Sequence, residues 1–138
     1  MICLIRIKGR VGVSADIGGT LFRLRLRKKY SCVVINPTKE ESGMIKKVRD
    51  FIAFGEIDKA TFEKLIEQRG KTLDKSKKLD AKKVVEGIEK GEKYDKLNLK
   101  PFFSMHPPRG GIETKKHFPK GVLGDHGKDI NKLLERML

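Results

Sequence analysis

The chain has 138 residues, 38% of them hydrophobic and 36% charged, and its net charge is +14. That charge favours a polyanionic partner. Nucleic acid fits better than membrane, because the sequence has no apolar run of 18 residues, no N-terminal signal pattern and no strongly hydrophobic interfacial helix. The two cysteines, Cys3 and Cys32, lie in apolar runs without zinc-ligand spacing, so we expect buried, reduced thiols in a cytosolic protein.

The first 57 residues carry alternating strand and helix signals. Residues 2–8 predict a strand with Cys3, Ile5 and Ile7 on one face. Ser14 is a plausible N-cap for a helix to about residue 28, and the apolar run 31–35 predicts a second strand. A helix from Gly43 and a strand at 53–57 follow. This order predicts an α+β fold with a ferredoxin-like β-α-β-α-β core at 1–57, its helices on one face of a small sheet.

Residues 58–138 are expected to form a mixed helical and extended C-terminal extension beside that core. Its predicted parts are a helix capped by Asp58, a Lys-rich middle segment with a short helix capped by Asp80, a strand near 102–106, a Pro-Pro-Arg-Gly-Gly loop and a C-terminal helix. The inward stripe of that last helix is Ile130, Leu133, Leu134 and Met137.

The helix predicted from Gly43 is the first candidate binding site. On a helical wheel its apolar residues share an arc of roughly 120°, and its basic residues occupy the remaining face. A glycine at the helix start, free backbone N–H groups and nearby cations suit a chain of phosphates. The alternative is an ordinary amphipathic helix with a solvated basic face. The apolar residues are Met44, Ile45, Val48, Phe51 and Ile52, and the basic ones are Lys46, Lys47 and Arg49.

The second candidate is the loop around Arg109. Two prolines precede this arginine and two glycines follow it, so its guanidinium is presented on a stiff, open loop where it can bind a phosphate or stack on a base. Lys115 and Lys116 follow within reach. The alternative here is a plain surface turn.

Catalytic patterns are weaker. Residues 15–20, Ala-Asp-Ile-Gly-Gly-Thr, match the phosphate-binding hairpin of actin-like sugar kinases, but that motif needs flanking strands and a second lobe that 138 residues cannot build. His106, His117 and His126 lack metal-pair spacing and a carboxylate cluster. We therefore expect no enzyme activity, cofactor, metal or small-molecule substrate.

Several segments together resemble one family, the large-subunit ribosomal protein L-thirty in its longer archaeal form, related to eukaryotic large-subunit protein seven. The matching segments occur in the right order along nearly the whole chain. They are Ile7-Lys8-Gly9-Arg10-Val11, Gly43-Met44 with Lys47-Val48, Phe51-Ile52-Ala53-Phe54-Gly55-Glu56, His106-Pro107-Pro108-Arg109-Gly110-Gly111, and Gly121-Val122-Leu123-Gly124 through Gly127 and Asp129-Ile130-Asn131 to Leu133-Leu134.

The resemblance implies a non-catalytic structural constituent of the large ribosomal subunit, cytoplasmic and bound to the ribosome. Its expected partners are large-subunit rRNA, nearby 5S rRNA and neighbouring large-subunit ribosomal proteins. An RNA-binding regulator or rRNA processing factor outside the ribosome remains the alternative. Ser42 stands where the family commonly has arginine, and Ser104 where a basic residue is expected. The RNA-binding candidates are Thr38, Ser42, Gly43, Met44, Lys46, Lys47, Arg49, Arg109, Lys115 and Lys116.

Overall fold

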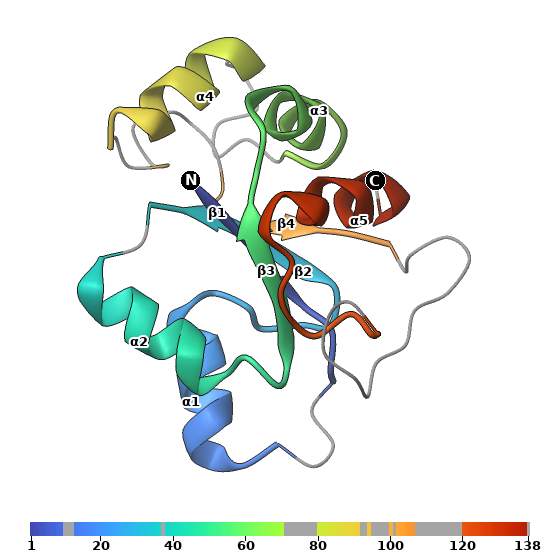
Figure 1. Ribbon diagram of the computed structural model, residues 1–138. Helices are drawn as coiled ribbons and strands as arrows, with labels where there is room; N and C mark the ends of the chain where they lie inside the picture. Colours follow the sequence, from blue (N-terminus) through green and yellow to red (C-terminus); the bar gives the residue numbers. More distant parts are fainter. Residues whose placement is uncertain are drawn as a thin grey trace.

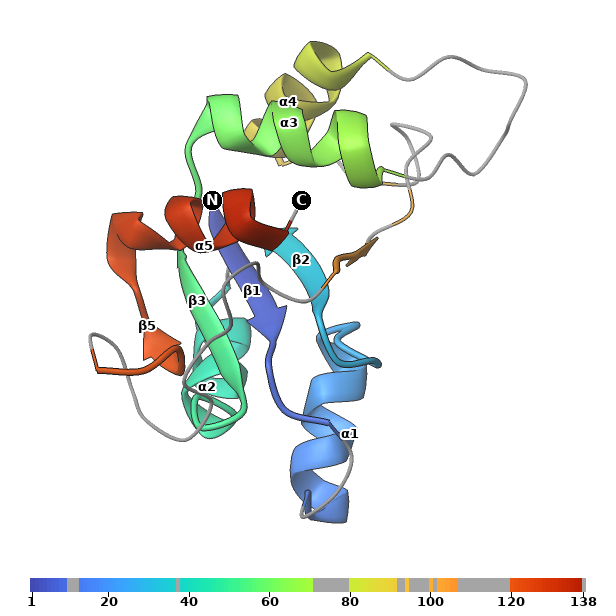
Figure 2. The same cartoon turned by 90° about the vertical axis from the view of Figure 1, so that its right-hand side faces the viewer.

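A five-stranded mixed sheet lies between two layers of helices (Figures 1 and 2). The computed structural model describes residues 1–9, 13–36, 38–70, 80–91, 94, 100, 102–106 and 120–137. The strands stand in the order β4-β2-β1-β3-β5; β1 is antiparallel to β2 and β3, β2 to β4, and β3 is parallel to β5. The predicted α+β, ferredoxin-like class is confirmed. The strands are β1 (Ile2–Arg6), β2 (Ser31–Ile35), β3 (Ile52–Glu56), β4 (Phe103–Ser104) and β5 (Gly124–Asp125).

Two helices, α1 (Ala15–Arg23) and α2 (Lys39–Lys47), cover one face of this sheet (Figure 1). Leu4 of β1, Val33 of β2 and Ile52 of β3 point to this side. They are buried against side chains of both helices and of the segments that follow them, because alternate strand residues face opposite sides of a sheet. The helical side of this core is Leu21, Leu24, Leu26, Ile45 and Val48.

The other face is covered by three helices, α3 (Lys59–Arg69), α4 (Ala81–Glu89) and α5 (Ile130–Met137). Cys3, Ile5 and Ile7 face this larger core together, as the strand pattern predicts. The inward stripe expected for the last helix is confirmed, since all four of its residues are buried. Residues beyond 57 therefore supply the second helical layer and both edge strands, while the division into two domains at residue 57 stays a prediction.

Helix α1 begins where the sequence predicts and ends earlier. The Ser14 hydroxyl accepts a hydrogen bond from the backbone N–H of Ile17 at 3.3 Å, which confirms the expected N-cap. The predicted end near residue 28 is wrong. The N–H of Leu26 donates to the carbonyl of Leu21 at 2.9 Å, and that of Arg25 to the carbonyl of Phe22 at 3.0 Å. This is a Schellman motif with Arg25 at φ 64°, where glycine is usual.

The kinase-like motif at residues 15–20 lies entirely within α1. The hairpin that such a motif requires would need strands on both sides of the glycines, and none is formed there. Gly18 and Gly19 are instead two helical glycines, each lowering helix stability by about 1 kcal/mol relative to alanine. These residues therefore do not form the phosphate-binding hairpin that their similarity to sugar kinases suggests.

Both cysteines are buried and reduced, as expected, with their Sγ atoms 3.2 Å apart between β1 and β2. Burial, with the neighbouring Cys32 thiol, raises the pKa of Cys3 well above its ordinary value. The unfolded thiol therefore loses its proton at a lower pH than the folded one. The contribution of the Cys3 thiol to the free energy of unfolding is therefore fully present below about pH 8.5, and it is lost as the pH rises above that value.

We expect neither thiol to react with an aromatic disulfide reagent at pH 8 unless the chain is unfolded. Denaturant melts between pH 7 and 10 should show a falling free energy of unfolding, and Cys3→Ala should flatten that decline. Rapid reaction of either thiol in the native protein would contradict the burial.

Candidate nucleic-acid interface

Helix α2 begins one turn before Gly43, so the prediction that this glycine opens the helix is wrong. Thr38 is the N-cap, and its hydroxyl accepts a hydrogen bond from the N–H of Glu41 at 3.3 Å. Glu40 and Glu41 follow in the first turn, where the helix dipole favours negative charge. Gly43 therefore lies in the middle of the helix, and its own N–H is not one of the free amides at the helix start.

The apolar arc predicted for this helix is also shorter than expected. The helix ends at Lys47 with Val48 as its C-cap, and Ile52 already belongs to β3. Phe51 lies in the connecting turn, where its carbonyl accepts the N–H groups of Ile7 and Lys8 at 3.1 and 3.3 Å. Pairing with β1 extends the third strand back to Ile52, and this ends the helix sooner than its apolar spacing suggests.

Three lysines surround Gly43 on the exposed side of α2. Residues three and four apart are neighbours on a helix surface, which places Lys39, Lys46 and Lys47 around Gly43. All four residues are exposed, and a Cβ atom added to Gly43 would meet nothing within 4 Å. We call these four residues the α2 lysine face. Its centre is a patch of bare backbone with these three lysines and one exposed carboxylate, that of Glu40, around it.

The other predicted residues of this region do not share that face. Thr38 is exposed and caps the helix, and Ser42 is half-buried. Met44 is half-buried and packs against the core beneath α1 and α2. Arg49 is exposed, but it lies in the turn after the helix end. The structure therefore brings Gly43, Lys46 and Lys47 together on α2, packs Met44 against the core and leaves Arg49 beyond the end of the helix.

Lys39 is the residue that the sequence interpretation missed. A helix that starts at Gly43 leaves Lys39 outside, although Thr38 and Glu41 have the Thr-x-x-Glu spacing that marks a helix start. Using that spacing would have moved the start of the helix back to residue 39 and included Lys39 in the same face as Gly43. The candidates Arg109, Lys115 and Lys116, with the loop at 107–111, lie outside the described residues.

Lys47 already has one partner within the chain. Its Nζ lies 2.8 Å from a carboxylate oxygen of Asp16, at the first turn of α1. The side chains are 42% and 76% exposed, and an ion pair so open to solvent contributes only about 0–1 kcal/mol. A phosphate can therefore replace Asp16 as the partner of Lys47 with little loss of protein stability.

Asp16→Asn is expected to tighten RNA binding about threefold at low salt, because Lys47 no longer has to leave a carboxylate. The matched control is Glu89→Gln, which raises the net charge by the same amount. Glu89 pairs with Lys59 at 3.0 Å, on the helices that cover the other face of the sheet. Equal gains for the two variants in a fluorescence titration would mean that only net charge matters.

The described part of the chain shows little that suggests other chemistry. No group of three His, Cys, Asp or Glu side chains there is placed to hold a metal ion. His126 is buried, and its ring nitrogen lies in hydrogen-bond contact with the carbonyl oxygen of Val122. None of the described helices is both long and apolar enough to cross a membrane.

Comparisons with known proteins point in one direction. Residues 2–52 match the family model described as ribosomal protein L30p/L7e. The chain is 41% identical to the large ribosomal subunit protein uL30 of Archaeoglobus fulgidus, over 99% of each chain. It is 37% identical to the protein of that name from Methanococcus maripaludis, covering 98% of this chain and 97% of the relative. For Staphylothermus marinus uL30 the identity is 38%, with 98% and 96% covered. The chain therefore belongs to the uL30 family of large ribosomal subunit proteins.

Proposed function

We propose that this protein is a structural constituent of the large ribosomal subunit, where it binds and positions large-subunit rRNA. It acts in the cytoplasm on the ribosome, without catalysis, cofactor or small-molecule substrate, and it also contacts neighbouring ribosomal proteins. The contacts are made by basic side chains and backbone on the α2 lysine face, with Thr38, Ser42 and Arg49 beside it. Arg109, Lys115 and Lys116 are proposed as further RNA contacts.

The observation that carries this proposal is Gly43. An exposed glycine inside a helix lowers its stability by about 1 kcal/mol relative to alanine, and no neighbour in the described structure requires it. Without a side chain at this point, a phosphate backbone can approach the helix closely between the three lysines. Family membership and the net charge of +14 support the same partner.

Sedimentation tests the proposal directly. The tagged protein should stay with the large subunit through a sucrose gradient in high salt, located by immunoblot against the rRNA absorbance. Contacts that are only electrostatic weaken steeply with salt, so a bystander or a regulator outside the ribosome should move to the top of the gradient. Recovery there would contradict the proposal.

A finer part of the proposal is that 5S rRNA lies near the bound protein. Ultraviolet cross-linking of assembled subunits, followed by sequencing of the attached RNA, should give cross-links to large-subunit rRNA close to the 5S contact region. Cross-links confined to regions remote from 5S rRNA would remove this part and leave the rest standing.

Gly43→Ala should have opposite effects on stability and binding. The free energy of unfolding is expected to rise by about 0.5–1 kcal/mol, because alanine is the better helix former and meets no neighbour. RNA affinity should fall, because the added methyl group holds the phosphate away. Gly19→Ala is the matched control: it is also a helical glycine with nothing within 4 Å, and it should stabilise without weakening RNA binding.

A further inference from the structure

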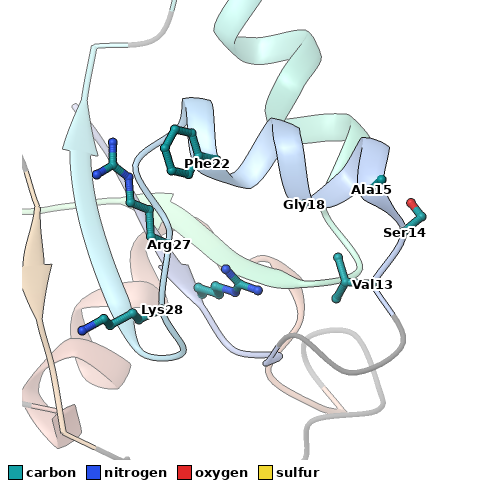
Figure 3. Close-up of a pocket in the computed structure, with 8 residues that line it drawn as sticks. Val13, Ser14, Ala15, Gly18, Phe22, Arg27 and Lys28 are labelled. Carbon is teal, nitrogen blue, oxygen red and sulfur yellow. The ribbon is translucent and has the colours of Figure 1, made fainter.

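A hollow of about 490 Å³ lies between α1 and the segment that follows it (Figure 3). Phe22 and Arg27 stand at one end, and Val13, Ser14 and Ala15 at the other. Its volume falls in the range of small-molecule and nucleotide sites. Among the residues that the structure describes, the lining is Arg6, Val13, Ser14, Ala15, Gly18, Phe22, Arg27 and Lys28.

Phe22 is unusual in its exposure. It is 58% exposed and is the one large hydrophobic residue so exposed among those the structure describes. The Arg27 guanidinium lies over its ring, 4.2 Å from the centroid. An exposed ring with a guanidinium beside it is the kind of surface on which an unstacked nucleobase is bound, since both groups present flat faces.

The wall of the hollow is fixed before any ligand arrives. Arg6 is 5% exposed, and its guanidinium donates to the carbonyls of Lys8 at 2.9 Å and Leu26 at 2.8 Å. These carbonyls belong to the chain leaving β1 and to the segment carrying Arg27, so one buried side chain holds both walls together. A site ordered in this way loses less conformational entropy on binding.

The charge of the hollow selects an anion. The described residues of its lining include three cations and no carboxylate. Asp16, which follows Ala15, pairs with Lys47, and the stretch from Ile17 to Lys39 has no aspartate or glutamate. Arg23, Arg25 and Lys29 stand near in sequence to Arg27 and Lys28. Because Leu24 and Leu26 are buried between them, these cations all remain at the surface.

We infer that this hollow binds an unpaired RNA nucleotide, its base stacked on Phe22 and its phosphate near Arg27 and Lys28. Unpaired RNA is favoured over duplex because a base inside a helix has no free face to offer. The inference rests on the proposed RNA-binding function and adds a second contact surface, separate from the α2 lysine face.

The test measures binding of the full chain to two labelled RNAs, a single strand and a blunt duplex with the same number of phosphates, by fluorescence anisotropy. Phe22→Leu keeps an apolar side chain but removes the ring, and it should weaken single-strand affinity about tenfold while duplex affinity stays unchanged. Phe22→Tyr keeps the ring and should bind the single strand as the parent does. Thermal melts of both variants should match the parent, because the side chain is largely exposed.

The inference is overturned if the Phe22→Leu and Phe22→Tyr variants bind the single strand with equal affinity. It is also overturned if Phe22→Leu loses the same affinity for the single strand as for the duplex. Its failure is distinguishable from failure of the proposed function. If alanine substitutions on the α2 lysine face weaken RNA binding while Phe22→Leu has no effect, only the hollow is excluded. If the unmodified chain binds neither RNA above background, RNA binding itself fails, and an acidic protein segment becomes the better occupant.

Discussion

Gly55→Ala is expected to lower the free energy of unfolding by about 3 kcal/mol. Gly55 is buried in β3, where an added Cβ atom would overlap the carbonyl oxygen of Gly127 and lie 2.9 Å from Cβ of Ile130. Neither neighbour can easily move away. The N–H of His126 donates to the Phe54 carbonyl at 2.8 Å, and the N–H of Asp58 to Oδ1 of Asn131 at 2.9 Å.

Chemical denaturation of the variant beside Gly9→Ala gives a matched comparison, since a Cβ atom at Gly9 meets nothing within 4 Å. Gly9→Ala should change stability little. If Gly55→Ala is equally harmless, the segment from β5 to α5 does not sit on β3 as described. A large loss confirms that Gly127 and Ile130, at the start of α5, pack directly on β3.

The elements that could be predicted from the sequence are those whose buried face follows from the periodic spacing of their apolar residues. Residues 2–5 are a continuous apolar run because β1 lies between two other strands and faces a core on each side, and every second residue, Cys3, Ile5 and Ile7, enters the same core. The last helix shows its stripe because Ile130, Leu133, Leu134 and Met137 face one core, while Lys132 and Glu135 on the other side are exposed. Predicting burial of this kind from the sequence needs no knowledge of the rest of the molecule.

Helix ends were harder to place, because capping chemistry and sheet pairing decide them. The stop after Arg23 depends on Arg25 taking a left-handed conformation that usually indicates glycine. The edge strands β4 and β5 have two residues each, too few for alternation to appear. Their place in the sheet is fixed by pairing with β2 and β3, which is a long-range effect.

The sequence predicts some residues of the candidate site but not how they are arranged. The basic residues and Gly43 stand out in composition, but their arrangement depends on where the helix begins. A helix starting at residue 39 groups Lys39 with Gly43, Lys46 and Lys47, whereas one starting at 43 groups Arg49 with them instead. The hollow beside Phe22 could not be found in this way, since Arg6 and Arg27 meet only after β1 and the segment after α1 are folded.

Replacing Lys39, Lys46 and Lys47 together by alanine should weaken RNA binding about a hundredfold at low salt, given ~1 kcal/mol for each lost phosphate contact. The slope of log affinity against log salt should become shallower by about 2 to 3 units, because three fewer counterions are released. The fold should persist, since all three side chains are exposed and alanine favours a helix.

The control is the triple alanine variant of Lys82, Lys83 and Lys90, at or just after α4 on the opposite face of the sheet. These side chains are also exposed, and the loss of net charge is identical, so long-range attraction of RNA is matched. Only direct contact then distinguishes the two variants. If both lose affinity equally and their salt slopes change together, the lysines around Gly43 act through net charge alone, and the glycine at their centre has no part in binding.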